Sequence, residues 1–95
     1  MKFLEKYGFN NEDIDEFINN TPKKLMEAVK ENKDLIEANL SFIKSLGAKT
    51  YREIFIYYTD LFFMDSSSFQ NMFNRYQKDS LIERLNENYK VVEYL

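Results

Sequence analysis

Histidine is absent from the 95 residues of this chain. The chain therefore lacks the usual general base at neutral pH and the commonest ligand of transition metals. A Ser–His or Cys–His nucleophile pair is impossible within it, so an enzyme would have to work with carboxylates, lysine or tyrosine. No arrangement of nucleophile, base or metal ligand can be named. We predict a protein that is not an enzyme and uses no cofactor and no metal.

Cysteine is absent as well, which excludes a disulfide framework and a thiolate metal site. This absence is compatible with a reducing compartment, and we expect a cytoplasmic protein. No apolar run approaches the roughly 18–20 residues that a membrane span needs, and charges return by Glu5, too early for a signal-peptide core. We expect a single domain over residues 1–95 and no membrane partner. The net charge of −3 argues mildly against bulk electrostatic binding of nucleic acid.

Two stretches of the chain, residues 8–26 and residues 47–64, have similar sequences. Phe17 corresponds to Phe55 and Thr21 to Thr59 at a constant offset of 38 residues, whereas the two glycines that begin the stretches are 39 residues apart. A period near forty residues, carried by short helical patterns, is typical of stacked helical repeats. A third unit begins near Asp79 and is cut short. We predict an all-α domain of five to six short helices in two and a half stacked repeats, as a small α-solenoid or irregular bundle.

Helix boundaries follow from capping residues and from apolar spacing. A short helix over residues 1–7 should end at Gly8, and Asn10 or Asn11 should begin a helix over residues 11–19. Thr21 is expected to cap a helix that starts at Pro22, and the longest helix is expected over residues 34–46, before Gly47.

The second half of the chain carries further start signals. Thr50 and Glu53 have the spacing of a capping box, and Thr59 is expected to act as a cap like Thr21. Residues 61–64 should form a short helix or 3-10 turn. Residues 65–68 should cap a helix over Phe69–Tyr76, and the last helix should begin at residue 79 or 80.

This order of parts resembles the repeat of the mitochondrial transcription termination factor family. In that family a helix ends in a leucine–glycine step, as at Leu46-Gly47, and a proline-started turn with a downstream leucine follows a short helix, as at Pro22 and Leu25. The family's repeats stack into a curved solenoid whose concave face binds double-stranded DNA or RNA through basic residues. The resemblance therefore implies nucleic-acid binding. The sequence departs from the family pattern where Asp60 and Tyr89 replace proline and where the chain is acidic.

Six basic side chains near helix starts and turns are the candidate nucleic-acid-binding residues. They would form a stripe along one face of the stack; the alternative is that they are solvated charges interleaved with carboxylates. The six are Lys23, Lys24, Lys49, Arg52, Arg75 and Lys78.

Two other groups have a functional and a structural interpretation. The aromatic residues between Phe55 and Phe69 are either a stacking groove or, as their spacing favours, a core, with Tyr57 as the member off the core face. The carboxylates of Glu12, Asp13, Asp15 and Glu16 are either a divalent-ion site or, as favoured here, helix capping and solvation.

The apolar C-terminal residues motivate a different class of function. Val91, Val92, Tyr94 and Leu95 should expose apolar surface unless the segment folds back or docks elsewhere. This predicts a small protein-interaction module or a homo-oligomer that associates through the C-terminal segment. We thus expect a non-enzymatic binding module, with DNA or RNA as one partner and another protein as the alternative.

Overall fold

The computed structural model describes residues 1–95 and contains α-helices, 3-10 helices (labelled η) and no β-strand. Helices take up 80% of the residues, so the predicted all-α class is confirmed. In chain order the elements are η1 (Lys2–Tyr7), α1 (Asn11–Asn20), α2 (Lys23–Glu31), α3 (Lys33–Leu46), α4 (Tyr51–Tyr57), η2 (Thr59–Phe63), α5 (Ser66–Asn74), α6 (Lys78–Glu87) and η3 (Tyr89–Tyr94).

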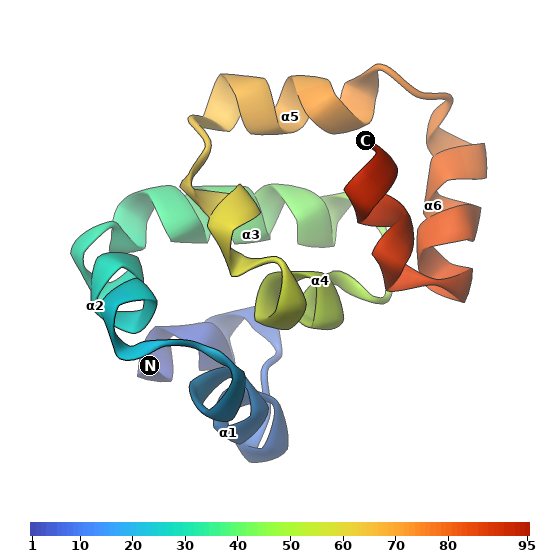
Figure 1. Ribbon diagram of the computed structural model, residues 1–95. Coiled ribbons are helices and arrows are strands. Elements are labelled where there is room, and N and C mark those ends of the chain that lie inside the picture. The colour runs from blue at the N-terminus through green and yellow to red at the C-terminus, as the bar shows by residue number, and fades with distance from the viewer.

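Helix α3 runs through the middle of the molecule (Figure 1) and contacts α2, α4, α5, η1 and η2. Helix α4 in turn packs against α1, and α6 with η3 closes the end of the molecule opposite α2. The radius of gyration is 12.7 Å, close to the roughly 12–13 Å of a compact globule of this length. None of the helices combines the length and the apolar composition that a membrane span requires.

Two of the predicted helix starts are confirmed in detail. The Asn10 side chain accepts a hydrogen bond from the Asp13 N–H (2.8 Å), and the Asp13 carboxylate accepts one from the Asn10 N–H (3.0 Å), which makes a reciprocal capping box at α1. Asp65 caps α5 by accepting from the Ser68 N–H at 3.0 Å, and hydrogen bonding with the Ser68 side chain and with this N–H lowers the pKa of the Asp65 carboxyl. Both capping bonds join residues that are three positions apart in the sequence.

The capping roles predicted for three threonines are wrong. The Thr50 hydroxyl donates to the carbonyl oxygen of Leu85 in α6 (2.7 Å) and makes no capping bond with α4. Thr59 donates back to the carbonyl oxygen of Phe55 (2.6 Å), so it closes the preceding helix instead of opening the next one. Thr21 is buried, and its hydroxyl has no hydrogen-bond partner. None of the three hydroxyls thus satisfies a free N–H group at the start of the following helix.

Both glycines that begin the two similar stretches end a helix in the left-handed conformation, as predicted. Gly8 has φ +86° after η1, and Gly47 has φ +93° after α3. Only glycine adopts such angles without a steric cost from Cβ. The two positions differ in their surroundings, because a Cβ on Gly8 would lie 2.6 Å from the hydroxyl oxygen of Tyr51, whereas nothing lies within 4 Å of a Cβ on Gly47.

The centre of the core is a ladder of phenylalanine rings that runs from α1 to α5. Successive ring centroids are 5.0 to 5.1 Å apart, within the range of favourable aromatic pairs. The rings belong to Phe17, Phe55, Phe62, Phe69 and Phe73, all of which are buried. The prediction that the aromatic residues form a core is confirmed, and Tyr57 lies at the surface as expected.

Residues that correspond at the offset of 38 are alike at some positions and different at others. Phe17 and Phe55 are both buried and their rings pack against each other, and Thr21 and Thr59 are both buried. Ile18, however, is 42% exposed, whereas Ile56 is 4% exposed. The correspondence between the two stretches therefore includes burial at Phe17 and Thr21 but not at Ile18.

Candidate functional site

The six predicted cations lie at three separate places in the fold. Lys23 and Lys24 begin α2, which lies at the opposite end of the molecule from α6, where Lys78 stands (Figure 1). Lys49 and Arg52 flank the start of α4, and Arg75 follows α5. All four lysines are exposed and make no ion pair. Lys23 and Lys24 therefore lie at one end of the molecule and Lys78 at the other.

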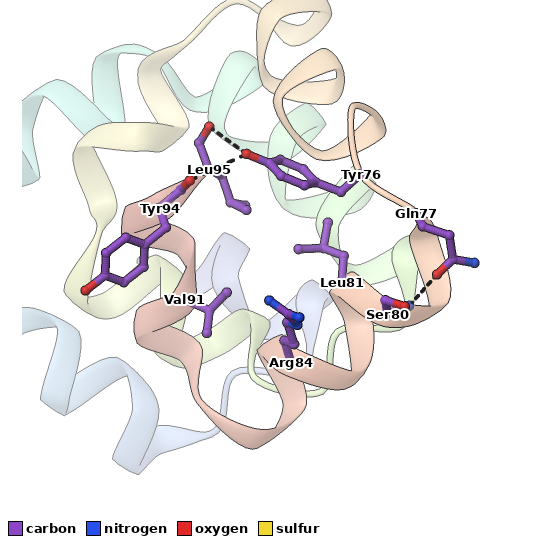
Figure 2. Close-up of a pocket in the computed structure, with 8 residues that line it drawn as sticks. All are labelled: Tyr76, Gln77, Ser80, Leu81, Arg84, Val91, Tyr94 and Leu95. Atoms are coloured by element: carbon purple, nitrogen blue, oxygen red, sulfur yellow. Dashed lines mark hydrogen bonds between the residues drawn. The ribbon is translucent and has the colours of Figure 1, made fainter.

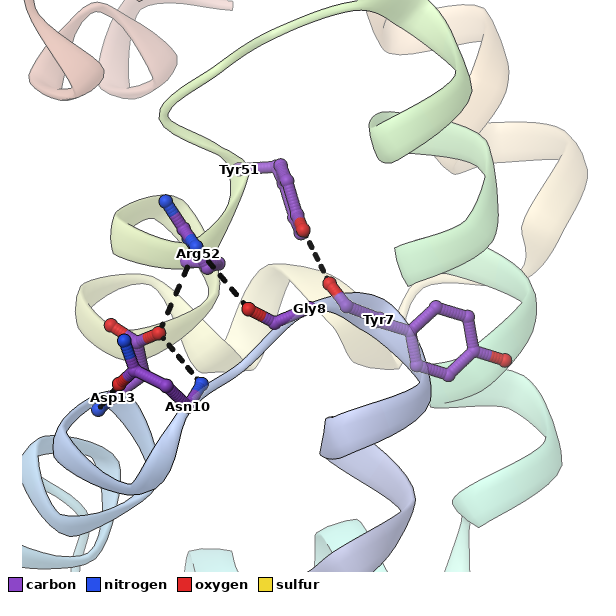
Figure 3. A network of polar contacts seen from close by, with 6 residues as sticks. All are labelled: Tyr7, Gly8, Asn10, Asp13, Tyr51 and Arg52. Carbon is purple, nitrogen blue, oxygen red and sulfur yellow. Dashed lines mark hydrogen bonds and ion pairs between the residues drawn. The ribbon is translucent and has the colours of Figure 1, made fainter.

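Arg52 is used inside the structure (Figure 3). Its guanidinium donates to the carbonyl oxygen of Gly8 at 3.2 Å and lies 3.9 Å from the carboxylate of Asp13. The Nε atom is buried without a partner. These contacts tie the start of α4 to the turn before α1, and the hydroxyl of Tyr51 donates to the carbonyl oxygen of Tyr7 in the same region.

Arg75 is also engaged within the chain. Its guanidinium donates to the carbonyl oxygen of Leu95 at 2.7 Å and lies 5.9 Å from the ring of Tyr76. Arg75 therefore holds the C-terminal turn against the end of α5. Two of the six candidate residues, both arginines, thus have partners of their own.

The acidic residues of α1 are not gathered as metal ligands, since no group of three or more potential ligands lies together anywhere in the structure. Asp13 belongs to the capping box, and Glu16 accepts a hydrogen bond from the hydroxyl of Tyr57. The ring of Tyr57 stacks on that of Tyr89 at a centroid distance of 5.4 Å. Tyr57, the predicted surface aromatic, thereby links α1, α4 and η3.

Glu93, a carboxylate of η3, also accepts a hydrogen bond from a tyrosine hydroxyl. The hydroxyl of Tyr58 donates to Glu93 at 2.6 Å. This hydrogen bond, with burial and the carboxylate charge, raises the pKa of Tyr58 to about 12. Glu93 is therefore directed toward α4.

The C-terminal segment folds back, which was one of the two outcomes allowed by its apolar sequence. Helix η3 packs against α6 and α4, and Val92 is buried. Tyr94, in contrast, is 81% exposed, and Tyr76, which follows α5, is 41% exposed. The apolar surface that remains therefore surrounds a hollow between the α5–α6 connection, α6 and η3.

This hollow, which we call the C-terminal groove, has a volume of about 290 Å³. Figure 2 shows its lining residues as a ring of side chains from the connection between α5 and α6, from α6 and from the C-terminal segment. Five are apolar or aromatic, two are neutral and polar, and one is charged. They are Tyr76, Gln77, Ser80, Leu81, Arg84, Val91, Tyr94 and Leu95.

Several contacts hold the walls of the C-terminal groove in place. The hydroxyl of Tyr76 lies 3.4 Å from the carbonyl oxygens of both Tyr94 and Leu95, which joins the α5 side to η3 (Figure 2). The Gln77 side chain caps α6 by accepting from the Ser80 N–H at 2.7 Å. Neutral polar groups on the rim thus already have partners within the protein.

Arg84 is the exception among the lining residues. Its guanidinium makes no hydrogen bond and no ion pair, and in Figure 2 it lies between Leu81 and Val91. The carboxylates of α6 belong to Asp79, Glu83 and Glu87; Glu87 is three residues from Arg84 and neighbours it on the helix surface, but no ion pair joins the two. The groove therefore combines an apolar lining with one free cation.

Two further hollows, of about 300 and 310 Å³, are less suited to a ligand. One is lined by the consecutive residues 31–35 between α2 and α3, of which only Leu35 is apolar. The other lies along α5 and has only Met64 and Met72 as apolar lining. The C-terminal groove is the hollow in which apolar residues form the majority of the lining.

Comparisons of this chain with protein-family models, with curated proteins and with solved structures find no match.

Sequence reasoning identified one wall of the C-terminal groove and missed the other. The apolar residues of η3 were singled out, but Arg84 was not, because it follows no motif and stands in a helix rich in charges. A weak signal existed in the i, i+3 spacing of Leu81 and Arg84, which places an apolar and a cationic side chain one turn apart. Its use required knowing that η3 packs beside this face.

Proposed function

We propose that this chain is a non-enzymatic binding module and that its ligand is a segment of another protein. The observation that carries the proposal is the C-terminal groove, with an apolar lining, two exposed tyrosines at its edge and an unpaired arginine. Tyrosine and arginine are enriched among the residues that contribute most to protein–protein binding. Tyrosine supplies a large contact area at a low cost in conformational entropy.

The size of the groove supports a peptide ligand over a cofactor. At about 290 Å³ it lies just below the range of roughly 300–1,000 Å³ that small-molecule sites occupy. A hollow of this size takes one or two side chains of a partner. The nucleophiles among the lining residues are the hydroxyls of Ser80, Tyr76 and Tyr94, and no base stands among them to activate any of the three. These lining residues therefore favour ligand binding over catalysis.

Nucleic-acid binding is the second proposal, and the resemblance to transcription termination factor repeats motivates it. With Arg52 and Arg75 engaged internally, the exposed lysines would have to carry the phosphate contacts. They stand at the separated starts of α2, α4 and α6. Each phosphate contact would add about 0.9 to the slope of log affinity against log salt.

The stacked-repeat arrangement belongs to the same proposal. It is supported by the left-handed glycines that end η1 and α3 and by the contact between the rings of Phe17 and Phe55. The unequal lengths of α3 (14 residues) and α5 (9 residues) would make the repeat a degenerate one.

The proposed function is tested by selecting peptides from a library of random dodecamers displayed on phage, followed by calorimetry with the synthetic peptides. We expect micromolar binding, with shifted backbone NMR signals at Leu81, Arg84 and Val91. A 20-base-pair DNA duplex and a single-stranded RNA of the same length are titrated in parallel at low salt. Selection of no binding peptide, or a footprint remote from α6 and η3, would contradict the proposal. Nucleic-acid binding that Lys23→Ala and Lys24→Ala weaken would favour the second proposal.

A further inference from the structure

The charged side chains at the C-terminal groove, as well as its shape, determine which ligands it can bind. Arg84 is the only lining residue with a charged side chain, and no aspartate or glutamate lines the groove. Glu93 accepts a hydrogen bond from Tyr58, and none of the carboxylates of α6 forms an ion pair with Arg84. The guanidinium of Arg75 near the rim is engaged by the main-chain oxygen of Leu95, which leaves Arg84 as the cation without a partner. The charged side chain that a ligand meets in the groove is therefore a cation, although the chain as a whole carries −3.

A cation among apolar side chains selects its ligand in two ways. A partner that covers Arg84 removes water from the guanidinium, which costs free energy unless a carboxylate takes the place of the water. Guanidinium and carboxylate match in geometry, since two parallel N–H groups can bond the two oxygens. A partner with a lysine or arginine at this place would suffer repulsion in addition to the loss of solvation.

From these contacts we infer that the C-terminal groove binds an acidic peptide segment anchored by one large apolar side chain. This inference rests on the proposed function and specifies the chemistry of its ligand. The apolar side chain fills the hollow between Leu81, Val91 and Leu95, and a carboxylate of the same segment pairs with Arg84. The exposed rings of Tyr76 and Tyr94 cover the anchor from the two sides of the groove.

The spacing of the two recognition elements follows from α6. Leu81 and Arg84 are three residues apart on one face of the helix, which is a rise of about 4.5 Å. The carboxylate of the ligand should therefore stand within one turn of the apolar anchor if the ligand is helical, or one to two residues away if it is extended. Acidic residues farther along the segment would contribute only by screened, long-range attraction.

The test uses three fluorescein-labelled dodecapeptides and fluorescence anisotropy. The parent peptide is one selected from the phage library. In the second peptide every acidic residue is replaced by lysine, and in the third the apolar anchor is replaced by serine. We expect the wild-type protein to bind the parent about five- to tenfold more tightly than the lysine peptide and to bind the serine peptide most weakly. This difference should shrink as salt is raised.

Two variants of the protein complete the test. Arg84→Glu should reverse the preference, so that the lysine peptide binds more tightly than the acidic parent. Lys44→Glu makes the same charge change at an exposed residue of α3 that forms no ion pair, and it should keep the wild-type preference. Both substitutions are at exposed positions, and circular dichroism checks that the variants keep the helical fold.

The outcomes separate the two proposals. Selected peptides that bind in the groove with no preference for charge, or that ignore Arg84→Glu, would overturn the acidic-segment inference and leave the peptide-binding function standing. A library that yields no binding peptide would overturn both. Concentration-dependent self-association by the wild-type chain that Arg84→Glu abolishes would also overturn the inference, because the occupant would then be a second copy and not another protein.

Discussion

The side chain of Asn39 in α3 donates a hydrogen bond to the carbonyl oxygen of Phe62 in η2, at 3.0 Å. A second bond from the same amide reaches the carbonyl oxygen of Met64, at 2.9 Å. Asn39 is fully buried, and its own carbonyl oxygen has no hydrogen-bond partner. The amide thereby joins the central helix to the short 3-10 turn beneath α5, at the point where the backbone of η2 ends.

Asn39→Ala should lower the free energy of unfolding by about 2–4 kcal/mol, because it leaves the Phe62 carbonyl buried without a donor and opens a small cavity. Urea denaturation followed by circular dichroism measures the loss. The matched control is Asn71→Ala in α5, an exposed asparagine whose side chain makes no hydrogen bond, with an expected change within about 0.5 kcal/mol. Equal losses in the two variants would show that the amide of Asn39 contributes nothing specific.

Alanine at the two left-handed glycines should have unequal costs. Gly47→Ala should cost about 1–2 kcal/mol from backbone strain alone, since a Cβ there has open space. Gly8→Ala carries the same strain and also forces Tyr51 away from the carbonyl oxygen of Tyr7, so its cost should be larger by about 1 kcal/mol or more.

Repeating both glycine substitutions in the Tyr51→Phe variant tests the role of the Tyr51 hydroxyl. In Tyr51→Phe the atom that a Cβ at residue 8 would meet is gone, and the nearest ring carbon lies 3.9 Å away, an ordinary contact. The costs of Gly8→Ala and Gly47→Ala should therefore converge in this background, as chemical unfolding of Tyr51→Phe, the two glycine variants and the two double variants would measure. A persistent gap between them would assign the extra cost of Gly8→Ala to something other than Tyr51.

Tyr7 and Glu37 should titrate as a linked pair. The hydroxyl of Tyr7 donates to Glu37 at 2.8 Å, and this bond, with Lys6 and Lys33 nearby, lowers the pKa of the Glu37 carboxyl. Burial and the same carboxylate raise the pKa of Tyr7 to about 12. Tyr7→Phe removes the main cause that lowers the pKa of Glu37, so this pKa should rise, as NMR titration of the side-chain carboxyl carbon would record.

The sign of the pH dependence follows from these two directions. A lowered carboxyl pKa stabilises the fold above the ordinary pKa of glutamate, and this contribution is lost as the pH falls through the folded value. A raised tyrosine pKa stabilises the fold below about pH 10, and this contribution is lost as the pH rises toward 12. Stability should therefore fall at both extremes of pH, and less steeply in Tyr7→Phe. Identical pH profiles for the two proteins would contradict the pairing.

Val92 should be the residue that holds η3 in place. Val92→Ala removes two buried methyl groups and should cost about 2 kcal/mol, whereas Val91→Ala, at a half-buried wall of the C-terminal groove, should cost less. Hydrogen exchange of the backbone amides in residues 89–95 should accelerate more in Val92→Ala than in Val91→Ala. Slow exchange in both variants would show that the contacts of Tyr58 and Arg75 suffice to hold the segment.

Much of the secondary structure could be predicted because its causes are local. The ends of η1 and α3 at glycine, the caps at Asn10 and Asp65, and the 3-10 turn after Thr59 all depend on residues within four positions of each other. The aromatic core followed from helical spacing in the same way. The capping box predicted at Thr50 failed because that hydroxyl donates to the carbonyl oxygen of Leu85, which is 35 residues away in the chain.

The candidate site could be predicted only in part. The six cations were chosen by their places near helix starts, but Arg52 and Arg75 contact carbonyl oxygens that are 44 and 20 residues away in the chain. A periodic sequence pattern does not predict contacts between residues so far apart in the chain. Arg84 shows the converse case, because it remained inconspicuous in the sequence and is the one charged residue of the C-terminal groove.

The sequence by itself determined the all-helical class, the positions of most helices and the absence of histidine and thiol chemistry, since caps, glycine stops and apolar spacing act over a few residues. The tertiary structure alone decided which charges are free and which are bound. The return of η3 onto α6 and α4 buries Val92, assembles the groove and leaves Arg84 without a partner. That outcome depends on distant segments meeting in space, where the packing of one face determines the surroundings of every charge beside it.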